Sequence, residues 1–234
     1  TVMPTAAPPT TSILIVAWNS GDDLARCMAA LEAQSVRDFE VILLDNGSTD
    51  GAVERLVQRA WLTCVHSDQN LGFAAGNNRA AQDASGRYLV TLNPDAFPDP
   101  DWLEMLVAAA ERYPEAGSVG STQLLDADPE LYDGAGDPYT VFGAAWRGGK
   151  GRPARPVVEG EVFGVCAAAA LCVSSARGEA LGGIPGHPAR ARPARASRQL
   201  CATKGGIRKG RYCTLKGPST PLSARSDGAV LPAP

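Results

Sequence analysis

A run of apolar residues ends in a polar turn that carries two side chains able to bind a cation. Leu89 and Leu92 belong to this run, and Pro94 ends it because proline has no N–H to donate to a sheet ladder. Asn93 and Asp95 are therefore expected just past the carboxyl end of a strand, where open α/β sheets bind ligands. An amide oxygen and a carboxylate suit a hard divalent cation that also holds a diphosphate. An ordinary turn role for Asp95 is the alternative, because aspartate is common in turns.

A second acidic side chain, Asp45, follows the apolar segment 39–44. Its carboxylate can accept hydrogen bonds from a ribose or from the edge of a base, and a buried acceptor of this kind discriminates strongly among ligands. The alternative is a turn or capping role, since Asn46-Gly47 is itself a turn signal. The local sequence does not decide between these two roles.

A glycine-rich helix start supplies a third candidate, an anion site. Asn70, Gly72 and Gly76 lie where the helical pattern of residues 70–84 begins. Backbone N–H groups at a helix start favour an anion such as a diphosphate. Small residues at this place also let a helix pack closely against a sheet, and that packing role is the alternative.

Alternating strands and helices are predicted to bring these side chains together. Ser20, with Asp23 after it, has the spacing of a capping box, and Asp50 is expected to cap the helix that follows the second strand. Short loops between such elements imply βαβ units, and so a mainly parallel sheet. The predicted strands are 12–18, 39–44, 63–66 and 88–93, and the predicted helices begin near residues 21, 51, 70 and 100.

The chain of 234 residues divides into an acidic body and a basic tail. Residues 1–170 carry 11 Lys or Arg and 23 Asp or Glu, whereas residues 171–234 carry 11 and 2. We expect a flexible arm over 1–11, one folded domain over 12–173, and a disordered tail over 174–234 that is rich in Pro, Gly, Ala and Arg. Binding of nucleic acid through the tail is the least favoured function, because a run of like charges is usually solvated.

Several other kinds of site are disfavoured. His66 and His187 are the only histidines, so a histidine-rich zinc site is not expected, and His66 is interpreted as a packing residue. No Gly-x-Gly-x-x-Gly follows the first strand. The six cysteines form no C-x-x-C pair, which favours reduced thiols in a cytoplasmic protein. No apolar run approaches the length of about 20 residues that spans a bilayer, and the first residues lack the pattern of a signal peptide.

Four motifs, taken together and in order, resemble family-2 glycosyltransferases, and most closely their rhamnosyltransferase-like subgroup. They lie at residues 15–20, 43–51, 70–78 and 92–96, and read IVAWNS, LLDNGSTDG, NLGFAAGNN and LNPDA. The resemblance implies a GT-A fold, which is an α/β, Rossmann-like βαβ sandwich with a mainly parallel central sheet. It also implies transfer of a sugar from a nucleotide-sugar with inversion.

The same resemblance implies roles for the candidate residues. Ala17, Asn19 and Asp45 would hold the nucleoside. Asn93 and Asp95 occupy the place of the family's D-x-D motif, with Asp95 as the ligand of Mg²⁺ or Mn²⁺ on the diphosphate. The implied nucleotide-sugar site comprises Ala17, Asn19, Asp45, Asn70, Gly72, Gly76, Asn93 and Asp95.

The partners that the resemblance implies are a nucleotide-diphospho-sugar donor and a glycan or lipid-linked acceptor. Such transfers belong to the assembly of cell-surface polysaccharide or cell wall. The expected location is the cytoplasm, with peripheral association at the inner face of the membrane through the acceptor.

The chain departs from the family where the catalytic base is expected. Family members carry an E-D-x-D motif beyond the stretch that here ends near Leu171. In this chain Glu179 and Asp227 are the only acids beyond that point, and neither belongs to such a motif. The sequence therefore assigns no catalytic base, and a truncated gene or an altered reading frame would explain the difference. Impaired transfer is expected, and a non-catalytic nucleotide-sugar-binding remnant is the alternative.

Overall fold

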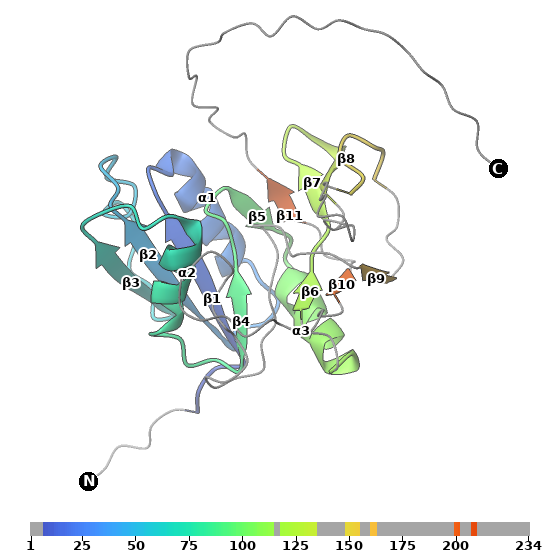
Figure 1. Cartoon of the computed structure of the whole chain (residues 1–234), viewed down its shortest axis with the longest axis horizontal. Coiled ribbons are helices and arrows are strands. Elements are labelled where there is room, and N and C mark those ends of the chain that lie inside the picture. Colours follow the sequence, from blue (N-terminus) through green and yellow to red (C-terminus); the bar gives the residue numbers. More distant parts are fainter. Residues whose placement is uncertain are drawn as a thin grey trace, which may run out of the picture.

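Four parallel strands form the centre of the fold. The structure is a computed structural model that describes residues 7–114, 118–134, 148–154, 160–162, 199–201 and 207–209. The central strands are β1 (Thr11–Ala17), β2 (Phe39–Asn46), β3 (Leu62–Ser67) and β4 (Tyr88–Thr91). Their order is β3-β2-β1-β4, and each neighbouring pair is parallel (Figure 1). This arrangement confirms the predicted α/β class with a mainly parallel central sheet.

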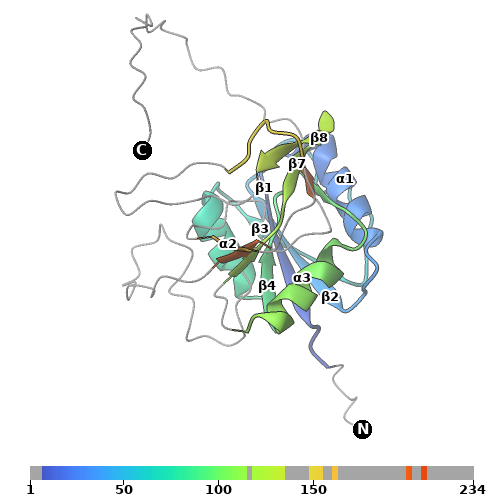
Figure 2. The ribbon, with the colours of Figure 1, turned by 90° about the vertical axis from the view of Figure 1, so that its right-hand side faces the viewer.

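Helices cover both faces of this sheet (Figure 2). They are α1 (Gly21–Glu32), α2 (Phe73–Ala81) and α3 (Trp102–Arg112). Successive residues of β1 point to opposite faces, as the pleat of a strand requires. Ile13 packs in one core with Leu24 of α1 and Leu103 of α3. Leu14 packs in the other core with Ala80 of α2. The strands β1, β2 and β4 are therefore buried on both faces, which is why they read as continuous apolar runs, whereas the edge strand β3 is partly exposed.

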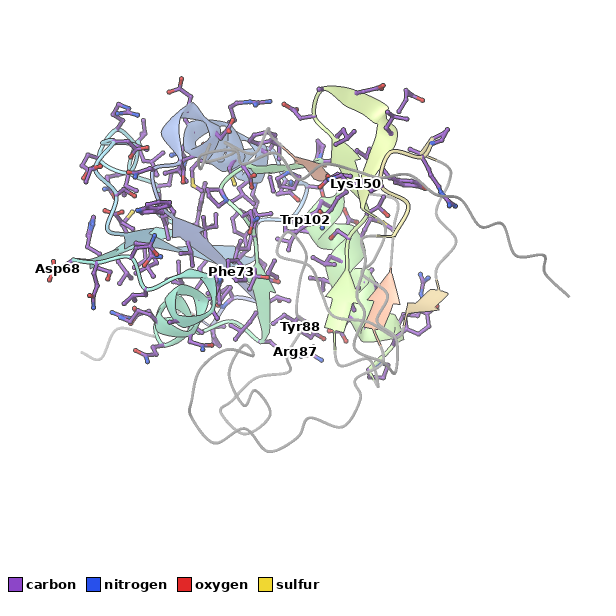
Figure 3. The ribbon with its side chains drawn as sticks, turned by 45° about the horizontal axis from the view of Figure 1, so that its top comes forward. Asp68, Phe73, Arg87, Tyr88, Trp102 and Lys150 are labelled. Atoms are coloured by element: carbon purple, nitrogen blue, oxygen red, sulfur yellow. The ribbon has the colours of Figure 1, made fainter. Side chains whose placement is uncertain are left out.

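Two smaller sheets lie beyond β4 (Figure 1). Their strands are β5 (Ala96–Pro98), β6 (Ser118–Gly120), β7 (Gln123–Leu125), β8 (Asp128–Gly134), β9 (Gly160–Val162), β10 (Gln199–Cys201) and β11 (Ile207–Lys209). The sheet orders are β6-β10-β9 and β5-β11-β7-β8. Trp102, labelled in Figure 3, is buried and ties α3 to the link between β6 and β7, because its Nε1 donates to Oγ of Ser121 (2.8 Å).

The strands β10 and β11 come from the region 174–234, where the sequence predicts disorder. Each is held by backbone pairing: β10 with β6 and β9, and β11 with β5 and β7. Long-range pairing of three-residue segments leaves no local signal, so the sequence did not indicate these strands. The rest of 174–234, and with it the prediction of disorder there, lies outside the described residues, as do residues 1–6 of the predicted flexible arm.

The start of α1 corrects the predicted capping box. Ser20 has helical backbone angles (φ −83°, ψ −7°), and its side chain makes no capping hydrogen bond. A serine cap requires an extended backbone, so its hydroxyl cannot reach back to the helix. Instead the N–H of Gly21 donates to Oδ2 of Asp50 (2.8 Å). The helix start is therefore capped by the loop that follows β2.

The helix predicted after β2 is a series of turns. Arg55 N–H donates to the carbonyl of Gly51 (3.3 Å), and Leu56 N–H donates to the carbonyl of Val53 (3.1 Å), but no regular helix forms. Val57, which lies in this segment, is 72% exposed. So short a segment makes too few hydrogen bonds to offset the cost of helix nucleation.

We predict that Leu43→Ala lowers the free energy of unfolding by about 2–5 kcal/mol, because it leaves a cavity in the core beneath the sheet. Leu43 is completely buried in β2. Urea unfolding measures the loss. Val57→Ala is the matched control, and the exposed position of Val57 predicts a change within about 0.5 kcal/mol. Equal losses at the two positions would contradict the core described above.

Candidate functional site

Three residues lie side by side at the carboxyl ends of β1, β2 and β3, and two of them, Ala17 and Asp45, are predicted site residues. Ala17 pairs with Asp45 in the register of β1 with β2, and Asp45 pairs with His66 in the register of β2 with β3. On the other side of β1, the N–H of Leu92 donates to the carbonyl of Leu14 (2.9 Å), so the turn beyond β4 lies at the same edge. The polar loops therefore meet at one edge of the sheet, as the sequence predicts.

Asp45 is buried at this edge, with 6% of its surface exposed. Its Oδ1 accepts a hydrogen bond from the N–H of Ser48 (3.0 Å), which is the turn role that the sequence left open. Its Oδ2 lies 3.3 Å from Nδ1 of His66. The carboxylate thus stabilises the loop with one oxygen and directs the other towards an exposed side chain.

His66 corrects the sequence interpretation, which treated it as a packing residue. Its side chain is 61% exposed, and it forms an ion pair with Asp45 when it is protonated. The two residues are 21 positions apart, so only the pairing of β2 with β3 brings them together. No local pattern could have shown this contact.

Asn19 joins the loop after β1 to the loop after β2. Its Oδ1 accepts a hydrogen bond from the N–H of Thr49 (2.9 Å), and its own N–H donates to Oγ of Ser48 (3.1 Å). Asn19 is also the one non-glycine residue with a positive φ (+48°) among the described residues. Asparagine tolerates this left-handed conformation better than most residues do. Asn19 therefore shapes the edge of the site.

Asn46 is a residue that the sequence did not single out as part of the site. It is buried, its Oδ1 accepts a hydrogen bond from the N–H of Leu71 (2.9 Å), and its Nδ2 donates to Oδ1 of Asn70 (3.0 Å). The same oxygen of Asn70 accepts from the N–H of Gly72 (2.8 Å). Two amide side chains thus hold the segment that leads into α2. They occupy the N–H groups of Leu71 and Gly72, which were candidates for binding an anion.

The two glycines of the helix start have different environments. Gly72 has a φ of +79°, and a Cβ added there would meet nothing within 4 Å, so the surface beside it is open. Gly76 is buried, and a Cβ on it would lie 2.9 Å from Cγ1 of Val16 and 3.3 Å from Cδ2 of Leu44. Close packing of the helix on the sheet, the alternative role, therefore applies to Gly76, whereas Gly72 borders free space next to the start of α2.

Asn93 and Asp95 are half-buried in the turn between β4 and β5. Beneath them, Sγ of Cys27 lies 3.8 Å from the carbonyl oxygen of Asn93. Burial raises the pKa of the Cys27 thiol, and the nearby charge of Asp95 raises it further. Oδ1 of Asp95 is itself buried.

The turn offers hard oxygen donors of the kind that Mg²⁺ or Mn²⁺ accepts. No group of three His, Cys, Asp or Glu side chains able to hold a metal occurs among the described residues. A cation bound at Asp95 would thus need the diphosphate and water for its remaining positions, which is the usual habit of Mg²⁺. The residues present fit such a partial ligand set.

Two aromatic side chains are exposed at the same edge, and the sequence analysis did not propose them. Trp18, directly after β1, is 47% exposed. Phe73, the first residue of α2 and labelled in Figure 3, is 44% exposed. Ring faces beside polar groups are typical of sites that hold an amphipathic ligand.

A parallel sheet whose strand ends carry carboxylates, beside an open helix start, defines an open α/β domain of the class that binds ligands at the carboxyl edge of its sheet. The chain belongs to the family Glycosyl transferase family 2, whose sequence profile matches residues 12–177. The predicted family is thereby confirmed, and with it the GT-A type of α/β sandwich. The match ends six residues beyond Leu171, where the sequence analysis placed the end of the resemblance.

Individual relatives support the predicted subgroup. The chain is 30% identical over 154 residues to an N-acetylglucosaminyl-diphospho-decaprenol L-rhamnosyltransferase of Mycobacterium tuberculosis, covering 57% of this chain and 50% of the relative. It is 36% identical over 127 residues to the O-antigen biosynthesis protein RfbC of Myxococcus xanthus, covering 52% of this chain and 10% of the relative. The chain thus spans about half the length of the first relative, and the likeness to a rhamnosyltransferase is confirmed.

Among solved structures, S. aureus TarS 1-349 in complex with UDP is similar to this chain. The match has 20% sequence identity and a TM-score of 0.45, and covers 49% of this chain and 35% of the TarS 1-349 chain. Within the part of the chain that the structure describes, none of the helices has the length and apolar character needed to cross a membrane.

Asp50 generates a pH-dependent prediction. Its two carboxylate oxygens accept hydrogen bonds from the N–H groups of Gly21 (2.8 Å) and Ala52 (3.1 Å). Burial alone would raise the pKa of Asp50, but these backbone hydrogen bonds outweigh it and hold the pKa below the usual value. A carboxyl group whose pKa is lowered by folding stabilises the protein above its unfolded pKa, and this contribution is lost as the pH falls through the folded pKa.

We therefore predict that Asp50→Asn lowers the free energy of unfolding at pH 7, and that the gap to the unsubstituted protein narrows below about pH 4, near the unfolded pKa of aspartate. Urea unfolding at pH 7 and pH 3 measures both differences. Asp68→Asn, at an exposed position of the loop after β3, is the control and should leave the pH dependence unchanged. A gap of equal size at both pH values would show that the charge of Asp50 contributes nothing.

Proposed function

We propose that the protein transfers a sugar from a nucleotide-diphospho-sugar donor to a glycan or lipid-linked acceptor, with inversion at the anomeric carbon. The observation that carries this proposal is the position of two carboxylates on either side of β1: Asp45 at the end of β2 and Asp95 beyond β4. Membership of Glycosyl transferase family 2 supports the class of reaction. The M. tuberculosis relative, an N-acetylglucosaminyl-diphospho-decaprenol L-rhamnosyltransferase, supports a lipid-linked acceptor, which would bring the protein to a membrane surface.

The donor would lie along the carboxyl edge of the sheet. Asp45 would accept a hydrogen bond from the base or the ribose, next to Ala17, while Asn19 would hold the loop that covers them. The open surface at Gly72 leaves room for the diphosphate at the start of α2, where the backbone N–H groups other than those held by Asn46 and Asn70 favour an anion. Asn70 and Gly76 would act indirectly. Asn70 holds the chain before α2, and Gly76 lets α2 pack closely on the sheet.

Asn93 and Asp95 are the residues that would hold the cation. When bound, Mg²⁺ or Mn²⁺ stabilises the charge that develops on the diphosphate leaving group. The turn itself is supported from below by Cys27, whose thiol donates to the carbonyl of Asn93. Because the loops are already joined by hydrogen bonds, the site loses little freedom when a donor binds.

A second candidate function is that of a nucleotide-sugar-binding remnant. The observation that favours it is that the family match ends at residue 177, before Glu179 and Asp227, the last two acids of the chain. An inverting transferase needs a base to take the proton of the acceptor hydroxyl. Both of these acids lie outside the described residues.

Donor binding is tested by calorimetry on the full chain with UDP and dTDP, with and without Mn²⁺ or Mg²⁺. We predict metal-dependent binding of at least one of the two nucleotides. Asp95→Asn should weaken the metal-dependent binding by at least about tenfold, because it replaces a charged oxygen ligand by a neutral amide. The melting temperature without ligand should change little. No metal-dependent heat with either nucleotide would contradict the site.

Catalytic competence is tested separately, with radiolabelled UDP-sugars and dTDP-sugars and a lipid-linked diphospho-sugar acceptor. We predict transfer near the background rate, while nucleotide binding persists, because the family's base motif is missing from the sequence. Robust transfer would contradict this prediction and would show that another carboxylate serves as the base. Glu179→Gln would then identify or exclude Glu179.

A further inference from the structure

The contact between His66 and Asp45 contributes little to holding the fold together. His66 lies at the exposed end of β3, with 61% of its side chain accessible, whereas the side chain of Asp45 is 8% accessible. An ion pair with so exposed a partner contributes little to stability. The contact does, however, involve the carboxylate of Asp45, which the proposed function places against the nucleoside.

The two oxygens of Asp45 are held by different partners. Oδ1 accepts from the N–H of Ser48 at 3.0 Å, within its own loop. Oδ2 faces Nδ1 of His66 at 3.3 Å, across the sheet. A carboxylate oxygen only accepts hydrogen bonds, so Nδ1 carries the proton in this contact. Without the imidazole, the main chain would hold the carboxylate through one oxygen only.

Oδ2 is therefore the oxygen that a ligand shares with His66. A carboxylate oxygen has two lone-pair sites, so Oδ2 can accept from the imidazole and from one ligand N–H at the same time. Uracil and thymine carry an N–H at ring position 3, whereas cytosine has an acceptor there. A carboxylate whose orientation is fixed can accept a hydrogen bond from uracil or thymine. With cytosine, its oxygen would face another acceptor, and no hydrogen bond would form.

We propose that His66 is a positioning residue for nucleobase recognition. Its Nδ1–H holds Oδ2 of Asp45 in the orientation that accepts the imide N–H of a uridine or thymidine diphosphate, and this orientation rejects a cytidine diphosphate. The inference rests on the proposed function, because it requires a nucleotide at Asp45. It adds a residue of β3 that determines which base the site accepts.

The test compares UDP and CDP binding to the full chain by calorimetry in the presence of Mn²⁺. His66→Ala should weaken UDP binding about tenfold, the size expected for one hydrogen bond to a charged group, and should change CDP binding less than about twofold. His66→Gln, which keeps a donor, should recover part of the UDP affinity. Thr63→Ala, an exposed position nearer the start of β3, is the matched control and should change neither affinity.

A spectroscopic measurement separates positioning from a structural effect. The chain has two histidines, so His66→Gln assigns the ring Cε1–H resonance of His66 by its disappearance. Addition of UDP should shift this resonance in the unsubstituted protein, and addition of CDP at the same concentration should not. The melting temperature of His66→Ala without ligand should equal that of the unsubstituted protein.

The outcomes distinguish an error in the role of His66 from an error in the proposed function. If the unsubstituted protein binds UDP and His66→Ala binds it equally well, the role of His66 is wrong and the proposed function stands. Equal losses of UDP and CDP affinity would also overturn the inference, because they would indicate a general disturbance of the site. If neither UDP nor dTDP binds the unsubstituted protein, the proposed function fails, and the role of His66 fails with it.

Discussion

The parallel pairing of β1 with β2 on one side and with β4 on the other determines where every candidate residue can lie. All four central strands run in the same direction, so their carboxyl ends reach one edge, and the loops that leave them meet there. The register sets the order Ala17, Asp45 and His66 across that edge. A slip of one residue in β2 would turn Asp45 from the face that it shares with Leu43 to the opposite face, which α2 covers, and the site would be lost.

Polar side chains then join the loops into one unit. Asn19 accepts from the loop after β2, Asp50 caps α1 from that same loop, and Asn46 holds the approach to α2. Each of these contacts satisfies backbone N–H groups that would otherwise need water. The residues around the proposed nucleotide position therefore divide into two groups. One group shapes the loops, and the other, with Asp45 and Asp95, would offer carboxylates to a ligand.

The sequence allowed the central sheet and the site edge to be predicted, because buried parallel strands read as apolar runs and chain order places their ends together. It could not show contacts that depend on pairing between distant segments. Asp50 reaches Gly21 across 29 positions, and His66 reaches Asp45 across 21, so a local capping box was expected at Ser20 and a packing role at His66. The roles of Gly72 and Gly76 also look identical in the sequence, and only the position of α2 on the sheet separates them.

The reactivity of the Cys27 thiol can be used to measure local motion at the site. Its thiol is sealed between α1 and the carbonyl of Asn93, and both burial and the charge of Asp95 keep it protonated. A thiol in this state reacts with an alkylating reagent only during the moments when α1 and the turn after β4 separate. The rate at which Cys27 is alkylated is therefore a measure of local opening at the turn that carries Asn93 and Asp95. A ligand that bridges this turn to the rest of the edge would slow that rate without touching the sulfur.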